Sequence, residues 1–114
     1  MEAKFMLRYS DVEKSYSKQK DKDNLFLIFK NLYKFAFLNR LLKENLVDEL
    51  GNFDKDKLLN ESDLTEVGLK IFEKLMYKWL TYTSNDDGKV DRINNIKMLE
   101  KYYDKLLKDY ESKK

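Results

Sequence analysis

The chain has 114 residues, 42% of them apolar and 39% charged, with a net charge of +2. This length predicts one domain over residues 1–114 that buries a core of its own. Cysteine and histidine are both absent, which excludes disulfide bonds, the usual zinc sites and nucleophiles paired with histidine. We therefore expect a protein that is not an enzyme, needs no cofactor or metal, and acts by binding another macromolecule.

The first predicted element is a helix over about residues 3–18. Apolar side chains recur there at spacings of three and four, at Met6, Tyr9, Val12 and Tyr16. An alternative begins the helix at Ser10, where Ser10 and Glu13 fit a capping box, and leaves residues 4–9 extended. The apolar stripe favours the longer helix.

The second predicted helix is long, apolar and central to the core. It begins at Asp23 or Asn24 and ends near Leu50, because Gly51 supplies the left-handed residue that commonly follows a helix. Its stripe is wider than half a turn, so it must be covered from more than one side. Charged and amide side chains interrupt the stripe, and no apolar leader precedes it. A membrane-spanning segment is therefore not expected, and the protein is predicted to be cytoplasmic.

Residues 52–63 are acidic and irregular, with at most one short turn over residues 54–59. A third helix is predicted over about residues 65–82 and a fourth over about residues 91–110, joined by the tight turn chemistry of residues 84–88. No stretch alternates as a β-strand would. The expected fold class is all-α: a single-domain bundle of about four helices around the long central helix.

Two residues of the third helix stand out as structural. Gly68 is unfavourable inside a helix, so it either lies in the first turn or makes room for a helix that passes close by. We interpret it as a packing glycine. Trp79 falls on the apolar stripe and is predicted to lie in the core, with its indole N–H donating to a polar partner at the edge.

The acidic loops are the candidate partner-binding surface. Complementary charge steers the encounter with a basic protein and sets its specificity, whereas the plainer interpretation is solvated surface with carboxylates that cap helices. The candidate residues lie mostly outside the apolar stripes: Asp54, Asp56, Glu61, Asp63, Asp86 and Asp87.

A nucleic-acid-binding surface on the last helix is the main alternative. Bases can stack on aromatic side chains while lysines neutralise phosphates. The candidate residues are Lys97, Lys101, Tyr102, Tyr103, Lys105, Lys108 and Tyr110. However, Tyr103 and Tyr110 fall on the apolar stripe, and Glu100 and Asp104 reduce the basic surplus that phosphate binding needs. Nucleic acid is therefore the less expected partner.

The third helix carries a family resemblance. It opens Leu64-Thr65-Glu66-Val67-Gly68 and closes Lys78-Trp79-Leu80-Thr81-Tyr82-Thr83, before a polar turn and a final helix. This pattern, over about the last half of the chain, is similar to that of small helical immunity proteins of bacterial contact-dependent growth inhibition systems.

The resemblance implies that the chain binds the toxic C-terminal domain of a delivered protein, often a nuclease. It implies neutralisation by occlusion of the toxin, with no chemistry of its own. A phage-type inhibitor of a host defence enzyme would have a similar composition. Such partners are commonly basic, and the acidic residues at 54–63 and 86–87 are where contact is expected. Because the net charge is +2, local patches rather than the whole molecule supply the electrostatic attraction.

Overall fold

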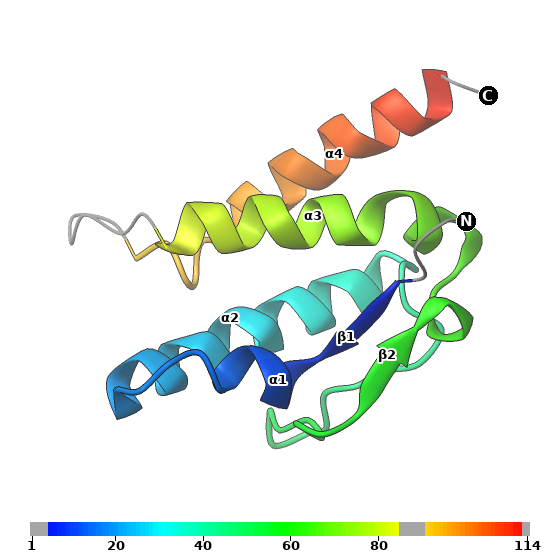
Figure 1. Ribbon diagram of the computed structural model, residues 1–114. Helices are drawn as coiled ribbons and strands as arrows, with labels where there is room; N and C mark the ends of the chain where they lie inside the picture. The colour runs from blue at the N-terminus through cyan, green and yellow to red at the C-terminus, as the bar shows by residue number, and fades with distance from the viewer. Residues whose placement is uncertain (1–4, 85–90, 113–114) are drawn as a thin grey trace.

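The computed structural model describes residues 5–84 and 91–112, and this part of the chain is mostly helical with a small antiparallel sheet. In Figure 1, α4 lies at the top, α3 and α2 follow below it, and α1 with the sheet lies at the bottom. The elements in chain order are β1 (Met6–Arg8), α1 (Tyr9–Glu13), α2 (Gln19–Leu38), β2 (Leu58–Asn60), the 3-10 helix η1 (Glu61–Asp63), α3 (Glu66–Ser84) and α4 (Ile96–Ser112).

The all-α prediction is wrong at the N-terminal end. Strand β1 pairs antiparallel with β2, with Leu7 opposite Leu59. Leu7 is buried and Met6 is exposed, the alternation of a strand with one covered face. The favoured helix over residues 3–18 is therefore incorrect, and the alternative with an extended start is closer. The capping box at Ser10 does not form, because α1 begins at Tyr9 after an extended Arg8 that makes no side-chain cap.

Helix α2 begins at Gln19, four residues before Asp23, and ends at Leu38, twelve residues before Leu50, so the long apolar helix expected from the sequence is not found. Arg40 adopts the left-handed conformation with φ 59°. The amide of Leu41 donates to the carbonyl of Ala36 at 2.8 Å, and that of Arg40 to Phe37 at 3.0 Å. These two bonds form a Schellman motif, the usual way to satisfy the last carbonyls of a helix. Arg40, rather than Gly51, therefore holds the left-handed position that ends this helix.

Residues at the start of α3 bind the backbone of the residues that directly follow α2. The amide of Thr65 donates to the Leu41 carbonyl at 3.1 Å, and the Thr65 hydroxyl donates to the Arg40 carbonyl. The same hydroxyl accepts the Gly68 amide at 3.0 Å, as an N-cap does. A methyl group on Gly68 would overlap the Leu41 carbonyl oxygen. The packing role of Gly68 is thus confirmed, although the neighbour is a loop rather than a helix.

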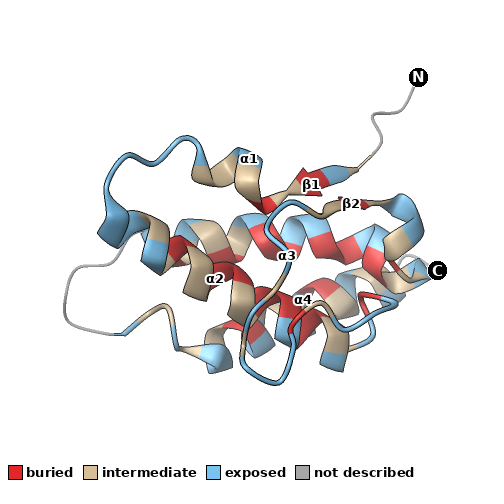
Figure 2. Ribbon diagram, turned by 90° about the horizontal axis from the view of Figure 1, so that it is seen from below, coloured by how far each residue is buried: buried red, intermediate tan, exposed pale blue. Residues whose placement is uncertain are grey.

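The core lies where α2, α3 and α4 face one another, as the buried faces in Figure 2 show. Trp79 is fully buried, which confirms its predicted place, and its indole N–H donates to the Ile28 carbonyl of α2 at 2.9 Å. The acceptor is a backbone group inside the core rather than at its edge. Tyr9 anchors the N-terminal part with edge-on ring contacts to Phe29 and Phe53.

Helix α4 begins at Ile96, about five residues later than predicted. The Asp91 carboxylate accepts the Asn94 amide and its side-chain N–H, which holds a turn before the helix. Arg92 lies over the Tyr82 ring and donates to the Tyr82 carbonyl at 3.1 Å. The predicted tight turn over residues 84–88 lies outside the described residues after Ser84.

Candidate protein-binding surface

The connection between α2 and β2, residues 39–57, is the largest departure from a helical bundle. Loops of this length without helix or strand are uncommon in compact domains and are usually functional when ordered. Buried side chains fix this loop to the core at Leu41, Leu42 and Val47. Phe53 stacks on Phe26 of α2, with ring centroids 4.8 Å apart. The loop is therefore built into the fold, and its remaining side chains are presented on a fixed backbone.

A tight turn at Asp48 shapes the outer part of this loop. The Asp48 carboxylate accepts the amides of Leu50 and Asn52, each at 2.9 Å. The Gly51 amide donates to the Asp48 carbonyl at 3.0 Å, and Gly51 has φ 83°, which a glycine adopts without strain. Leu50, at the tip of this turn, is 86% exposed. The turn thus directs a leucine into solvent rather than into the core.

The loop and the residues that follow it concentrate negative charge. Residues 43–63, here named the acidic segment, contain seven acidic and three basic residues, in a chain whose total charge is +2. Glu44, Glu49 and Glu61 are exposed. Within the described part of the chain, these three carboxylates make no hydrogen bond or ion pair. They are free to meet a basic partner.

The predicted acidic candidates fall into three groups. Asp54 and Asp56 lie together, because the Asp54 carboxylate accepts the Asp56 amide at 2.9 Å, and both are exposed. Glu61 is exposed at the start of η1. Asp63 is partly buried in a capping box, where it accepts the Asn60 amide at 2.9 Å and faces Lys57 at 3.8 Å. Asp63 therefore has the cap role that was its plainer interpretation.

Asp86 and Asp87 lie outside the described residues. The other candidates do not form one patch around a single point. Strand β2, about 10 Å long at 3.3 Å per residue, separates Asp54 and Asp56 from Glu61 and Asp63. Arg8 donates to the Asp56 carbonyl at 3.1 Å, which brings a positive charge to that side.

A groove borders the N-terminal part of the acidic segment. It has a volume of about 470 Å³ and lies between the C-terminal half of α2 and residues 45–49. Leu38, on its α2 side, is 75% exposed. The described lining residues are Lys34, Phe37, Leu38, Asn45, Val47, Asp48 and Glu49. We name it the α2 groove.

Sequence reasoning missed the α2 groove because it placed residues 45–49 inside a helix. The leucines at 41, 42 and 46 continue a helical spacing, which hid the loop. A signal was present in the Asp48 to Asn52 stretch, which combines the residue types of a tight turn around Gly51.

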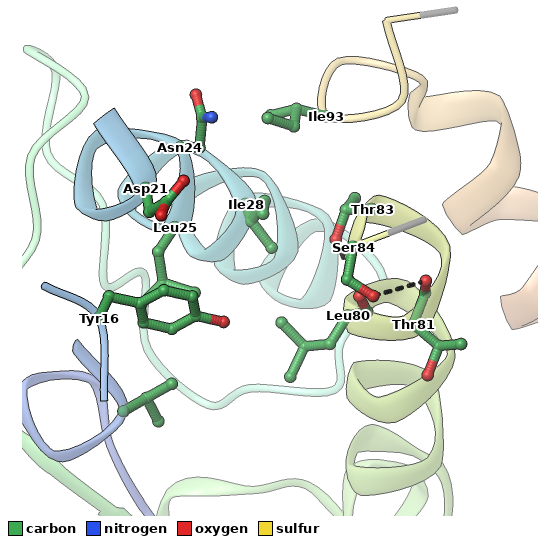
Figure 3. Close-up of a pocket in the computed structure, with 11 residues that line it drawn as sticks. Tyr16, Asp21, Asn24, Leu25, Ile28, Leu80, Thr81, Thr83, Ser84 and Ile93 are labelled. Carbon is green, nitrogen blue, oxygen red and sulfur yellow. Dashed lines mark hydrogen bonds between the residues drawn. The ribbon is translucent and has the colours of Figure 1, made fainter. Parts of the chain in front are cut away.

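A second cleft of about 510 Å³ lies between α1, the start of α2 and the end of α3 (Figure 3). Its lining includes the apolar side chains of Leu25, Ile28 and Leu80. The hydroxyl of Thr83 donates to the Trp79 carbonyl at 2.9 Å, and that of Ser84 donates to Thr81 at 3.0 Å. Both hydroxyls are thus bonded to the carbonyls of their own helix, which is a structural use of polar groups in helices.

Two tyrosines have displaced pKa values for structural reasons. Burial raises the pKa of Tyr33 above its ordinary value. Burial, and secondarily the negative charge of Glu13, raise the pKa of Tyr9 in the same direction. The Tyr9 hydroxyl donates to the Lys22 carbonyl at 3.3 Å. Both groups stay protonated at neutral pH and contribute to packing.

The alternative surface on α4 uses its aromatic side chains for packing. Tyr103 contacts Phe35 edge-on at 5.6 Å, and Tyr102 contacts Tyr82 at 6.3 Å. Both are partly buried, which reduces the ring surface on which a base could stack. The lysines of this helix are exposed beside Glu100 and Asp104, as the sequence predicts for a mixed surface.

Over residues 5–84 and 91–112, no group of three acidic, cysteine or histidine side chains is arranged to hold a metal ion. None of the helices in the same ranges is long and apolar enough to cross a membrane. Comparison with known proteins gave no match to a protein-family model, to a curated protein or to a solved structure.

Proposed function

We propose that this protein is an immunity protein, which binds the toxic domain of a bacterial toxin and blocks it by occlusion. The observation that carries this proposal is the anchored loop over residues 39–57, which presents carboxylates and an exposed leucine on a fixed backbone. Fixed, exposed and chemically mixed loops are where binding residues concentrate in proteins. A nuclease toxin is a suitable partner, because proteins that bind nucleic acid carry basic surfaces.

The loop is suited to binding because it is ordered before the partner arrives. Its turn is held by the Asp48 carboxylate and its ends by Leu41 and Phe53. Little conformational entropy is then lost on association, which favours affinity. The carboxylates at its surface accelerate the encounter with a basic partner and oppose acidic ones. Occlusion of the toxin needs no further chemistry from this chain.

The motif that carries the family resemblance supports this arrangement indirectly. Thr65 holds the loop where it leaves α2, by donating to the Leu41 and Arg40 carbonyls, and Gly68 leaves room for this close approach. In this chain the motif is therefore part of the support of the proposed binding loop. We expect substitutions in it to act on binding through the loop rather than through direct contact with a toxin.

A growth assay tests the proposal. The C-terminal region of the protein encoded immediately upstream is expressed in a naive bacterium, with and without this chain. We expect growth arrest by the neighbour alone and rescue on co-expression. A toxic neighbour that this chain does not rescue contradicts the proposal.

A pair of charge variants locates the interface in the same assay. Glu44→Lys with Glu49→Lys reverses two charges in the acidic segment, whereas Glu100→Lys with Asp104→Lys makes the same change in net charge on α4. All four positions are exposed, so both variants should fold. We expect the first variant to lose rescue and the second to retain it. Equal rescue by both would place the interface elsewhere.

The nucleic-acid alternative predicts the opposite sensitivity. Binding to phosphates falls steeply with salt, and Lys97→Glu with Lys101→Glu should abolish it. Under the immunity proposal, this double change leaves rescue intact. Retention of a double-stranded oligonucleotide at low salt, lost in this variant, would favour the alternative.

A further inference from the structure

We infer that the α2 groove is the anchor point of the interface, and that it receives an apolar side chain flanked by basic residues on the partner. This inference rests on the proposed binding function, because it assigns the partner's contact chemistry. It does not depend on what reaction the toxin catalyses. Its basis is the coincidence of an apolar groove, an exposed leucine and an acidic rim.

The apolar part of the groove is formed before binding. Val47, on the loop side, is buried, and Phe37, on the helix side, is partly buried. Leu38 stands beside them 75% exposed, although it sits on the last turn of α2. The volume of about 470 Å³ is ample for one apolar side chain, since clefts that bind whole small molecules measure roughly 300–1,000 Å³. A side chain seated there would remove Leu38 from water, which is favourable.

The charged part of the groove is asymmetric. Asp48 and Glu49 line its loop side, and Lys34 is the one basic residue among its described lining residues. The Asp48 carboxylate is oriented by the amides of Leu50 and Asn52. Lysine or arginine side chains next to the partner's apolar anchor would therefore meet two carboxylates at a defined place. Acidic partners would meet repulsion at the same rim, which gives specificity.

Leu69, on the solvent face of α3, is a natural reference for this inference. It is a helical leucine that is 49% exposed, against 75% for Leu38, and it does not line the α2 groove. Glu73, also exposed on α3, serves the same purpose for Glu49. Matched substitutions at the two places separate an anchored contact from a general effect of surface apolarity or charge.

Peptide titration tests the inference without knowledge of the toxin. The probe is a short amphipathic helical peptide made only of leucine and lysine. Companion peptides replace leucine with alanine, or lysine with glutamate. Binding to the full chain is followed by NMR of its ¹⁵N-labelled backbone amides. We expect chemical shift changes centred on residues 34–38 and 45–49 with the leucine–lysine peptide. They should be far weaker with either companion. Shift changes centred on another surface, or equal with all three peptides, overturn the inference.

The matched variants sharpen the test. Removing a buried leucine contact should weaken affinity roughly tenfold, so Leu38→Ser should raise the peptide Kd by that factor while Leu69→Ser leaves it unchanged. Loss of one exposed charge pair is worth roughly threefold, so Glu49→Gln should have that smaller effect and Glu73→Gln none. Thermal unfolding of each variant checks that it is folded. Equal changes in the peptide Kd for the variants in the α2 groove and the variants on α3 overturn the inference.

The two proposals fail separately. If Leu38→Ser rescues growth as well as the unmodified chain does, the immunity function stands and the groove assignment falls. If the peptide binds as expected but the chain does not rescue growth from a toxic neighbour, the groove assignment stands. The immunity function then falls.

Discussion

Gly68→Ala is the most informative single substitution, because its expected sign is opposite to the ordinary one. Replacing glycine by alanine inside a helix usually stabilises a protein by about 0.5–1 kcal/mol, since alanine loses less backbone freedom on folding. Gly68 is the third residue of α3, in its first turn, so this gain is at most the interior value. A methyl group there, however, would overlap the Leu41 carbonyl oxygen and lie 2.9 Å from its carbonyl carbon.

The magnitude follows from what must move. Carbon atoms pack best at about 3.5–4.0 Å, so the carbonyl carbon alone requires a shift of about 0.6 Å, and the closer overlap with the carbonyl oxygen requires a larger one. That carbonyl accepts the Thr65 amide at 3.1 Å, and the neighbouring Arg40 carbonyl accepts the Thr65 hydroxyl. Losing two such bonds costs about 2 kcal/mol, and overpacking adds about 1–2 kcal/mol. After the gain from replacing glycine in a helix is subtracted, we expect the free energy of unfolding to fall by about 2–3 kcal/mol.

Denaturant unfolding followed by the fluorescence of Trp79 measures this change, and thermal unfolding should show a fall in Tm of roughly 8–12 °C. Leu69→Ala, on the exposed side of the same turn, is the control and should change stability by less than about 0.5 kcal/mol. A Gly68→Ala variant that is as stable as the original chain, or more stable, would refute the close approach of Leu41 to α3.

Three further substitutions test separate parts of the fold. Arg40→Gly should stabilise the protein by about 0.5–1 kcal/mol, because glycine adopts φ 59° without the penalty of a side chain. If the helix continued through this position, the same change would instead destabilise the protein by about 1 kcal/mol. Trp79→Phe should destabilise the protein by about 2–3 kcal/mol, through the lost bond to Ile28 and the space left behind, as measured by circular dichroism in denaturant. Tyr33→Phe should make the protein more resistant to alkali, as measured by its free energy of unfolding at a series of pH values.

The sign for Tyr33 follows from proton linkage. Its pKa is raised in the folded state, so the unfolded chain releases this proton at the ordinary pKa of 10.0 while the folded chain retains it. The contribution of the Tyr33 hydroxyl to the free energy of unfolding is complete below about pH 10. Above that pH it falls by up to about 1.4 kcal/mol per pH unit. Tyr77→Phe is the control, because Tyr77 is 60% exposed. Equal alkaline slopes in both variants and the original chain would show that Tyr33 is not protected.

Features set by local spacing could be predicted from the sequence. The stripe of α3 places Trp79 in the core, and the structure confirms it. The helix also begins where Thr65 was expected to begin it. Gly68 could be recognised as unusual because glycine is costly in a helix. In each case a period of 3.6 residues, or a single residue's conformational preference, carries the information.

Features set by contacts between distant segments could not be predicted. Leu42 and Leu46 continue the apolar spacing of α2, so periodicity extends the helix past its true end. The chain leaves the helix at Arg40, where Thr65, more than twenty residues later, donates its amide to the Leu41 carbonyl and Gly68 leaves room for that carbonyl. Strand β1 likewise depends on its pairing with β2, about fifty residues away in sequence. Tertiary contacts override local preference at both places.

The candidate site was predicted in chemistry but not in position. Negative charge and a loop were both expected for the stretch around Asp54 and Asp56, and both residues are exposed there. Asp63, however, is used as a cap and faces Lys57. The carboxylates of residues 44–50 make no ion pair within the described part of the chain, and the sequence placed this stretch on a helix. An acidic patch can be counted from a sequence, but only the folded backbone decides which carboxylates are already neutralised.

The end of α2 and the proposed binding surface have one physical cause. If α2 continued to Leu50, the residues that line the α2 groove would lie on one helix, with no second wall opposite Leu38. The bonds from Thr65 to the carbonyls of residues 40–41, made possible by the missing side chain of Gly68, fix the chain where it turns back, and residues 45–49 form that second wall. Gly68→Ala should therefore weaken binding of the leucine–lysine peptide even under conditions where the variant is folded. Arg40→Gly, which relaxes the same turn without moving it, should leave binding unchanged.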